Sequence, residues 1–499
     1  MIRLKYRFRR PFPTPGTAIS AIALAWGLFG VRLFRIDGDV GRHIRVGREI
    51  LRSGEIPRTD LFSHTMFGEP FVPYEWLSEL CFAMADQIAG LTGVAVLSSL
   101  LFAATTLVVY STARRIGAGP LFASLAAALS MVLQAVHLLP RPHLFTTLLA
   151  AAFLLLLETY RSRRSVVALG ALIPLMVLWV NLHGGFLVGF ILLAVYSLDA
   201  WRSGSDVAAN RIPMALATSA CLIVSFLNPA GPGVWSHTLS YFGMEFLVDQ
   251  TNEYRSPDFH QLHGKVFLAS ILIGLSLLGS GISRAGFRDF TLFLGWLAAG
   301  LMSTRNIPLF GVLAVPWFAL WAKNIVVQSR GGSASSTASM IETFDERTGK
   351  VEAQINGLIP AVGLALILVF LAARDEGERY VFEPDSFPVR AVGALDGLSL
   401  QGNVYNEMPW GGYLLYARPD IPVFIDGQTD FYGEALSRDY LRMRHLSPGA
   451  LDLLDDYEVD WALIPRAAPL SQGLSLSPRW RLAYEDSVAS VFARIPWDR

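Results

Sequence analysis

Two aspartates and a histidine stand close together directly after the first long apolar segment of the chain. They are Asp37, Asp39 and His43. Ionisable side chains cost free energy near lipid, so they are seldom placed there for packing alone. An aspartate at the mouth of a membrane bundle can act as a general base, or it can bind a metal ion together with a neighbouring carboxylate or imidazole. The structural alternative is that Asp37 and Asp39 supply the N-cap and the first-turn charge of a helix.

The segment after Asp39 has the pattern of a surface helix. Residues 40–53 place apolar side chains among arginines and glutamate, as in an amphipathic helix that lies in the membrane interface. Asp39 and His43 are four residues apart, so they share one face of such a helix. A divalent cation such as Mg²⁺ or Mn²⁺, held by Asp37, Asp39 and His43, is the one cofactor that the sequence leaves open. No HExxH zinc motif and no Gly-rich nucleotide loop is found, so ATP-driven transport has no support.

Further polar residues follow at the ends of later apolar segments, on the side that the loops assign to the exterior. The candidates for binding substrate or a lipid phosphate are Arg141, His143, His183, Glu253, Arg305 and Asn306. An arginine at membrane depth costs about 2.5–3.5 kcal/mol. A lipid phosphate would offset that cost, because its oxygens match the two-pronged guanidinium. The alternatives are arginines that anchor helix ends and a histidine, His183, that packs a tight turn.

The composition places the chain in a membrane. Of its 499 residues, 53% are hydrophobic and only 16% are charged, and the mean hydropathy is +0.42. A soluble chain carries about 25% charged residues. The 41 basic and 41 acidic residues balance, so no basic surface argues for nucleic acid. The two cysteines, Cys81 and Cys221, lie inside apolar runs, and their number excludes a disulfide framework.

Apolar segments that suit spanning helices occur up to residue 373. There are about eleven of them, each near the roughly 20 residues that a bilayer requires, at roughly 17–35, 92–112, 119–138, 143–160, 166–182, 185–200, 212–228, 266–281, 289–304, 307–322 and 357–373. Basic residues gather in alternate loops, which predicts a cytoplasmic N-terminus. An odd number of spans then places the C-terminus outside the cytoplasm.

The sequence therefore predicts an α-helical polytopic membrane domain at 1–373 and a small extracytoplasmic α/β domain at 374–499. The first contains an outer loop with interfacial helices at 37–91 and a flexible, Gly- and Ser-rich cytoplasmic loop at 323–356. In the second, short β-like runs alternate with helical stretches. Its candidate binding residues, for sugar hydroxyls or a cation, are Tyr413, Asp426 and Asp430. A turn at the end of a strand is the structural alternative for Asp426.

Several short motifs together resemble a large set of mostly uncharacterised bacterial polytopic membrane proteins, which are grouped with GT-C-type glycosyltransferases. The resemblance runs over nearly the whole chain. It is carried by Asp37-Gly-Asp39-Val-Gly-Arg-His43, Pro57-Arg-Thr-Asp60-Leu-Phe-Ser63, Glu75-Trp76-Leu77, Arg141-Pro-His143, Asn181-Leu-His183-Gly-Gly, Arg305-Asn306 and the Tyr413/Asp426-Gly427 region. Two residues depart from that pattern. Arg42 stands where the family has an aromatic residue, and Gln428 stands where it often has an arginine.

The resemblance implies an enzyme of the bacterial inner membrane with a GT-C-like fold. It would move a sugar, with inversion, from a polyprenyl-phosphate-linked donor to a lipid, glycan or protein acceptor on the extracytoplasmic face. Asp39 would be the general base, with Asp37 as the second candidate, and the phosphate leaves without a second carboxylic acid. The alternative function is a non-catalytic carrier of lipid or polysaccharide, or an assembly scaffold. A transporter would place polar residues near the bilayer midplane, whereas here they gather at one face.

Overall fold

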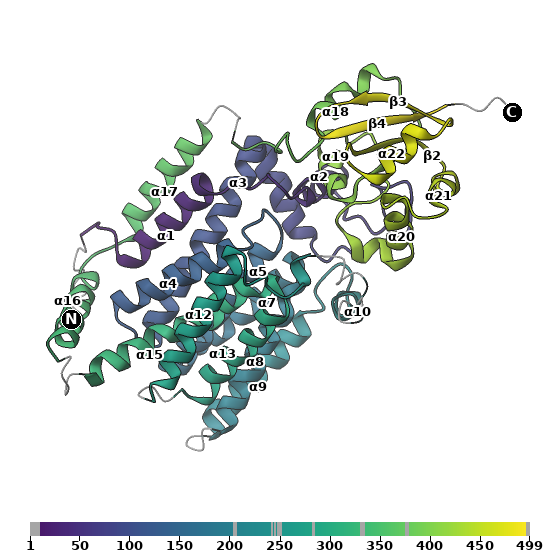
Figure 1. The fold of residues 1–499 in the computed structure, drawn as a ribbon. Helices are drawn as coiled ribbons and strands as arrows, with labels where there is room; N and C mark the ends of the chain where they lie inside the picture. The colour runs from purple at the N-terminus through teal and green to yellow at the C-terminus, as the bar shows by residue number, and fades with distance from the viewer. Residues whose placement is uncertain are drawn as a thin grey trace.

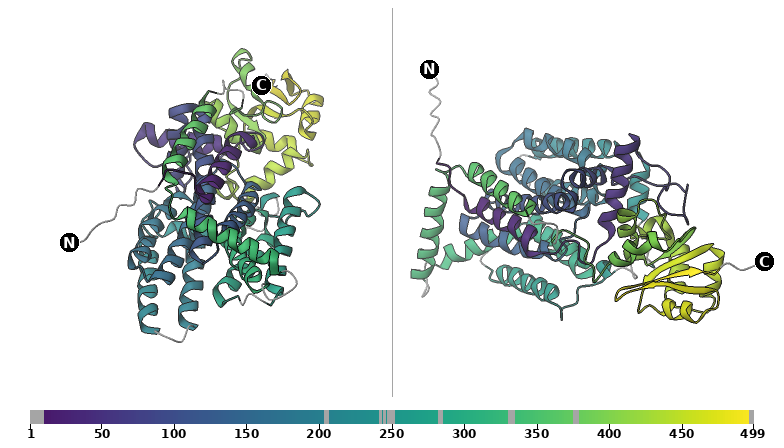
Figure 2. Two further views of the ribbon diagram at one scale, coloured as in Figure 1. Left: turned by 90° about the vertical axis from the view of Figure 1, so that its left-hand side faces the viewer. Right: turned by 90° about the horizontal axis from the view of Figure 1, so that it is seen from above.

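A bundle of helices with a small sheet at one end forms the molecule (Figure 1). The computed structural model describes residues 10–202, 207–240, 243, 246, 252–281, 285–329, 335–374 and 379–495. The sheet and α16 (Ser335–Glu352) lie at opposite ends of the bundle (Figures 1 and 2). A site at one end is therefore remote from a site at the other.

Helices lie at each of the predicted apolar segments. They are α1 (Pro15–Ala25) with η1 (Trp26–Gly30), α3 (Trp76–Arg115), α4 (Pro120–Ala135), α5 (His143–Arg163), α6 (Val166–Gly170), α7 (Leu172–Leu182), η2 (Gly184–Phe186), α8 (Leu187–Arg202), α9 (Val207–Val224), α12 (Leu262–Gly279), α13 (Phe287–Met302), α14 (Ile307–Leu313), α15 (Val315–Gln328) and α17 (Leu358–Ala373). Several of their large apolar side chains, such as Trp179, Trp317 and Phe267, are fully buried in the core, while others, such as Leu272 and Leu366, are exposed on the outside of the bundle.

Four of these helices, among the described residues, are long and apolar enough to cross a membrane by themselves. They are Trp76–Arg115, His143–Arg163, Gly184–Arg202 and Leu262–Gly279. The pair Thr304–Leu313 and Val315–Gln328, bent by 47°, is a fifth if it forms one broken span. Most of the other apolar helices have 10–17 residues. The chain is a membrane protein, and the count of about eleven spans stays a prediction.

The first outer loop folds into two helical pieces, as its pattern predicts. The helix α2 (Asp39–Ser53) ends at Gly54, whose φ of +73° is the left-handed conformation common after a helix. The long helix α3 loses helical geometry at Ala89 and Gly90, which separates its first turns from the apolar span. However, α2 does not lie open in the interface. It packs between α3 and α19 (Met408–Ala417), and most of its residues are buried.

The loop predicted to be flexible at 323–356 contains a helix, and this corrects the prediction. Residues 335–352 form α16, which packs on α4 and α15. Asp345 accepts a hydrogen bond from the backbone N–H of Leu121 at 2.8 Å, and Glu352 pairs with Arg114 at 3.0 Å. The sequence could not show these partners, since they lie far away along the chain. Residues 330–334, which hold part of the Gly- and Ser-rich run, are outside the described residues.

The last part of the chain combines a four-stranded sheet with short helices, as predicted for 374–499. The strands are β1 (Asn403–Asn406), β2 (Val459–Pro465), β3 (Trp480–Glu485) and β4 (Ala489–Arg494). They lie in the order β1-β2-β4-β3, and only the β1–β2 pair is parallel. The helices are α18 (Val389–Ala394), η7 (Leu395–Gly397), α19, α20 (Thr429–Arg444), α21 (Ala450–Asp456) and α22 (Pro469–Leu476). The domain boundary at 374 stays a prediction.

One β-like run of the sequence is not a strand of this sheet. Residues 423–425 are buried, but Val423 forms only an isolated bridge, with Ser63 of the first outer loop. The backbone N–H of Val423 donates to the carbonyl of Phe62, and the N–H of His64 donates to the carbonyl of Val423, both at 3.0 Å. The segment therefore joins the C-terminal region to the first outer loop.

Candidate functional site

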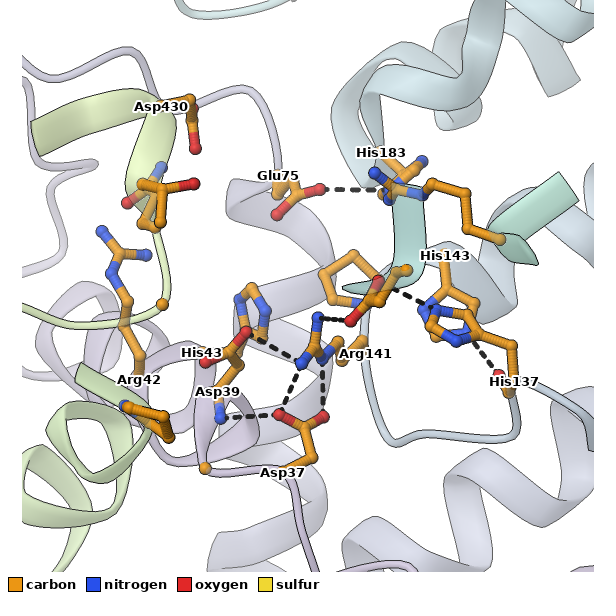
Figure 3. A pocket seen from close by; sticks show the side chains of 18 of the residues that line it. Asp37, Asp39, Arg42, His43, Glu75, His137, Arg141, His143, His183 and Asp430 are labelled. Carbon is orange, nitrogen blue, oxygen red and sulfur yellow. Dashed lines mark hydrogen bonds and ion pairs between the residues drawn. The ribbon is translucent and has the colours of Figure 1, made fainter. Parts of the chain in front are cut away.

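A cavity of about 420 Å³ lies where α2, the starts of α3 and α5, and the segment around α19 and α20 meet. Figure 3 shows that carboxylates, imidazoles and guanidinium groups point into it from several elements. Nine of the twelve predicted site residues line the cavity: Asp37, Asp39, His43, Arg141, His143, His183, Glu253, Arg305 and Asp430. The fold thus brings together side chains that are far apart in the sequence.

The other three predicted residues have structural contacts and do not line the cavity. Asn306 donates a hydrogen bond from its amide to the carbonyl of Ala299 at 3.1 Å. Tyr413 is buried in an aromatic cluster with Phe382, with ring centroids 4.9 Å apart. Asp426 is 1% exposed and accepts hydrogen bonds from other buried side chains, Arg42 at 3.1 Å and Tyr432 at 3.2 Å.

Arg141 is surrounded by carboxylates in the cavity wall (Figure 3). Its Nε and Nη2 donate to the two oxygens of Asp37 at 2.6 and 2.7 Å. Its Nη2 also lies 3.1 Å from Asp39 Oδ2, and its Nη1 donates to Glu253 Oε1 at 2.9 Å. Because each terminal nitrogen already faces a carboxylate, Arg141 serves to hold acidic groups in place. The prediction that it binds phosphate is less well supported by this geometry.

Asp37 and Asp39 differ in exposure and in charge environment, although they are two residues apart. The Asp37 side chain is 3% exposed. Burial acts to raise the pKa of Asp37, but the charge and hydrogen bonds of Arg141 outweigh burial and lower that pKa. The Asp37 carboxylate also accepts the backbone N–H of Asp39 at 3.0 Å, although the N-cap residue of α2 is Gly38 and not Asp37.

Asp39 is the more exposed carboxylate of the pair. Its side chain is 20% exposed and lines the cavity. Burial raises the pKa of Asp39 to about 6, with Arg141 opposing the shift and the charge of Asp37 adding to it. A carboxylate with a pKa near 6 is ionised at neutral pH, yet is a stronger base than an ordinary aspartate. This is the property that a general base requires.

Three predicted histidines line the cavity, and each is oriented by a different partner. His43 lies one helical turn after Asp39, with Nδ1 3.5 Å from Glu79 Oε1. The ring of His143 lies at 43° to the ring of His137 with centroids 4.5 Å apart, and its Nε2 is 2.9 Å from the His137 carbonyl oxygen. His183 Nδ1 accepts the backbone N–H of Gly185 at 2.8 Å, so a neutral His183 ring carries its proton on Nε2. That atom lies 3.5 Å from Glu75 Oε1 (Figure 3).

Glu75 is a site residue that was not among the predicted ones. It precedes the first residue of α3 and lines the cavity. Burial, followed by the negative charges of Glu79 and Asp430, raises the pKa of Glu75 well above its usual value. A carboxyl that keeps its proton can donate a hydrogen bond to a substrate. The sequence feature that could have identified Glu75 as a site residue is its position, an acidic residue directly before an apolar helix in the motif Glu75-Trp76-Leu77.

The C-terminal region supplies one wall of the cavity, through Met408, Pro409, Gly427, Gln428, Thr429 and Asp430. A Cβ atom on Gly427 would lie 1.9 Å from Asp39 Oδ1, and one on Gly412 would lie 2.3 Å from the carbonyl oxygen of Gly38. The turn that presents Asp39 therefore packs directly on this region. Such close approach is open only to residues without a side chain.

Replacing Gly427 with alanine is expected to lower the rate of the reaction that takes place in this cavity, without unfolding the protein. The added methyl group must displace the Asp39 carboxylate, which Arg141 holds from the other side. A displacement of about 1 Å near reacting atoms can cost about 100-fold in rate. Steady-state kinetics and thermal unfolding of the full chain measure the effect. Gly393→Ala is the matched control, because a Cβ there meets no atom within 4 Å. Equal rates in the two variants would contradict the expectation.

The residues considered for a divalent cation do not fit that role as they are placed. Both Asp37 oxygens are occupied by Arg141, and His43 Nδ1 is directed to Glu79. Among the described residues, no group of three or more His, Cys, Asp or Glu side chains has an arrangement that holds a metal ion. The positive charge beside Asp39 is supplied by Arg141, and no step below is routed through a cation.

No family model matches the chain, and no curated protein matches it in sequence. Among solved structures, it is similar to the archaeal oligosaccharyltransferase AglB from Archaeoglobus fulgidus, in complex with an inhibitory peptide and a dolichol-phosphate. The TM-score is 0.61 at 13% identity, covering 97% of this chain and 74% of that one. For the arabinofuranosyltransferase AftD from Mycobacteria, the TM-score is 0.54 at 14% identity, covering 97% and 40%.

The third neighbour matches over nearly the whole of both chains. It is ArnT from Cupriavidus metallidurans in the apo state, with a TM-score of 0.50 at 16% identity, covering 96% of this chain and 97% of that one. At identities this low, the structural similarity establishes a shared fold only. The reaction of this chain must be argued from its own residues. The protein has the fold of the GT-C glycosyltransferases over nearly its whole length, with a helical bundle and a small C-terminal sheet.

Proposed function

We propose that the protein is an inverting glycosyltransferase that moves a sugar from a polyprenyl-phosphate-linked donor to an acceptor hydroxyl in this cavity. The observation that carries the proposal is the position of Asp39, a carboxylate with a pKa near 6 in the same cavity as Arg305. The fold supports it, because the similar AglB structure holds a dolichol-phosphate. The sugar and the acceptor are left open.

Asp39 is the proposed general base. Its carboxylate takes the proton of the acceptor hydroxyl while the acceptor oxygen forms a bond to the anomeric carbon. The bond from that carbon to the phosphate oxygen breaks, and its electron pair leaves with the lipid phosphate. A single displacement of this kind inverts the configuration of the anomeric carbon. Proton transfer to a positioned base contributes roughly 10²–10⁴-fold to such a rate.

Arg305 is the proposed partner of the leaving phosphate. It lies in η5 (Thr304–Asn306), between α13 and α14, and its guanidinium stacks on the ring of Tyr254 with 4.6 Å to the centroid. Tyr254 also accepts a hydrogen bond from Arg305 through its hydroxyl oxygen. A guanidinium braced in this way can bind two phosphate oxygens and stabilise the charge that develops as the bond breaks. Arg141 has no such role in this proposal, because each of its terminal nitrogens faces a carboxylate.

Asp37 is a positioning residue in this proposal. It fixes Arg141 through two hydrogen bonds and accepts the backbone N–H of Asp39 in a third. The proposal also keeps the predicted topology, with a cytoplasmic N-terminus, a cavity that opens on the extracytoplasmic face of a bacterial inner membrane, and the C-terminal region outside. Polar groups gathered at one end of the bundle support an active site of that kind.

Binding of a polyprenyl phosphate to the full-length protein tests the proposal directly. Native mass spectrometry of the detergent-solubilised protein measures the apparent affinity. Arg305→Gln is expected to weaken binding by about 10- to 150-fold, since one charge-assisted hydrogen bond contributes about 1.5–3 kcal/mol. The matched control is Arg255→Gln, an exposed arginine of the preceding loop that does not line the cavity.

Two outcomes would decide against the proposed function in different ways. Equal binding by the two variants would remove Arg305 from the phosphate site. Binding that depends on Arg305, without turnover of any polyprenyl-phosphate-linked sugar, would favour the alternative of a non-catalytic lipid or polysaccharide carrier. A carrier should also open alternately to both sides of the membrane, whereas the proposed enzyme should open only to the outer face and to lipid.

A further inference from the structure

A second polar cavity lies at the end of the bundle remote from the sheet. Its volume is about 410 Å³, and its walls come from the last turns of α3 and α5 and the end of α16. It is lined by Tyr110, Ser111, Arg114, Arg115, Arg163 and Glu352. None of these residues belongs to the candidate site described above, which occupies the opposite end of the molecule (Figure 1).

The single acidic residue of this cavity is already neutralised. Glu352 accepts a hydrogen bond from the Tyr110 hydroxyl at 2.7 Å, and its second oxygen lies 3.0 Å from Arg114 Nη2. Arg114 also donates to the carbonyl of Ala118 at 2.7 Å. These contacts fix the wall that α16 contributes, so the cavity is a built feature of the fold and not a gap between mobile side chains.

Two arginines of the cavity remain without a counter-ion. Within the part of the chain that the structure describes, neither Arg115 nor Arg163 has an acidic partner, and the buried Nε of Arg115 has no hydrogen-bond partner. Two like charges facing one cavity repel each other. An anion between them would relieve the repulsion and take up the unused donors, and phosphate oxygens match guanidinium groups best.

The outward face of α16 indicates that the anion belongs to a lipid. Met340, Phe344 and Val351 are 67%, 57% and 58% exposed, and their spacing along α16 puts them on one side of the helix. The buried residues Ala338 and Asp345 face the bundle instead. An amphipathic helix across the end of a membrane bundle places its apolar side in the bilayer interface, at the depth of the lipid phosphates.

We infer that this cavity binds the phosphate group of an anionic membrane lipid through Arg115 and Arg163. The inference does not depend on the proposed glycosyl transfer, because the two cavities share no residue. Each guanidinium–phosphate contact is a charge-assisted hydrogen bond that contributes about 1.5 kcal/mol or more, which corresponds to about tenfold in affinity. The two arginines together are expected to contribute about 100-fold.

Native mass spectrometry of the full-length protein, titrated with phosphatidylglycerol, tests the inference. The double variant Arg115→Gln/Arg163→Gln is expected to bind the lipid about 100-fold more weakly. The control is Arg347→Gln/Lys350→Gln, which removes two positive charges from exposed positions of α16 outside the cavity. It is expected to lose no more than about 25-fold, the general attraction of two basic residues to an anionic leaflet. Unchanged melting temperatures show that both double variants fold.

Competition separates the two sources of a phosphate group. Binding of phosphatidylglycerol to the wild type that persists in millimolar inorganic phosphate supports a lipid site. If inorganic phosphate displaces the lipid from the wild type but not from the Arg115→Gln/Arg163→Gln variant, the cavity is a phosphate site filled from solution, and the lipid inference is overturned. Equal loss of lipid binding in both double variants would mean that only the net charge of this end matters, and it would overturn the inference. Unchanged binding in both variants would overturn it as well.

Discussion

Asparagine at position 39 is expected to lower sugar transfer by roughly 10²–10⁴-fold while the protein stays folded and membrane-inserted. Asn keeps the size and one hydrogen-bond acceptor of Asp39 but cannot take a proton from an acceptor hydroxyl. Removing this negative charge should not destabilise the fold, because the carboxylate is partly exposed and Arg141 keeps Asp37 and Glu253 as partners. Transfer of a labelled sugar from a polyprenyl-phosphate donor, measured beside the melting temperature, gives both readouts.

A matched acidic residue controls for the loss of charge. Glu69 lies in the same outer loop, is exposed and does not line the cavity, so Glu69→Gln should transfer sugar at the wild-type rate. Asp37→Asn should behave differently from both variants, with a clear loss of stability, because it removes the partner that fixes Arg141. Transfer by Asp39→Asn at more than a tenth of the wild-type rate would remove Asp39 as the base.

Much of the candidate site could be predicted because the boundaries of apolar segments can be read from the sequence. Asp37, Arg141, His183 and Arg305 all stand where an apolar run begins or ends. Helices that cross a common layer bring such boundaries to the same level, so polar residues at the boundaries meet. The cavity contains all four of these residues, together with five other predicted ones, of which Asp430 was predicted from the C-terminal region and not from a boundary of an apolar segment.

The contacts between site residues could not be predicted, because they join distant parts of the chain. Asp37 and Arg141 are 104 residues apart, and their pairing decides that Asp39 and not Asp37 keeps an exposed carboxylate. The raised pKa of Glu75 depends first on its burial by the fold, and then on the charges of Glu79 and of Asp430 from the C-terminal region. Neither the Asp37–Arg141 pair nor the surroundings of Glu75 can be recognised from the residues that are adjacent in sequence.

Arg42 shows how a departure from a family pattern can be absorbed by the fold. It is 4% exposed and donates from Nε to Asp426 at 3.1 Å, across 384 residues of sequence. Its Nη1 lies 3.5 Å from Glu79. Burial of these charges is tolerated because each has a partner. Asp426, which was predicted to bind sugar or a cation, instead ties the C-terminal region to the helix that begins at Asp39.

Replacing Arg141 with glutamine should have the second large effect, on stability and on the pH dependence of activity together. The variant leaves Asp37 buried without its cation, and we expect a loss of about 3 kcal/mol, the lower end of the range for breaking a buried pair. The lower end applies because the Arg141 side chain is 24% exposed. Arg141→Lys restores the charge without the two-pronged geometry and should lose less.

The sign of the stability change with pH follows from the two aspartates. The lowered pKa of Asp37 stabilises the wild type above the pKa of an unfolded aspartate, and this stabilisation is lost as the pH falls through the folded-state value. The raised pKa of Asp39 acts in the opposite direction, favouring the folded state at low pH and losing that effect as the pH rises through about 6. Without Arg141 the Asp37 contribution disappears, so the variant should lose more stability at neutral pH than in acid.

The activity profile should shift in the same variant. In the wild type, kcat/KM should rise with pH up to about 6, where Asp39 becomes ionised, and then level off. Arg141 opposes the rise in the pKa of Asp39, so its removal should move this acid limb above pH 6. Activity that falls equally at every pH would show that Arg141 acts only on the fold. An acid limb that stays in place would show that Arg141 does not set the basicity of Asp39.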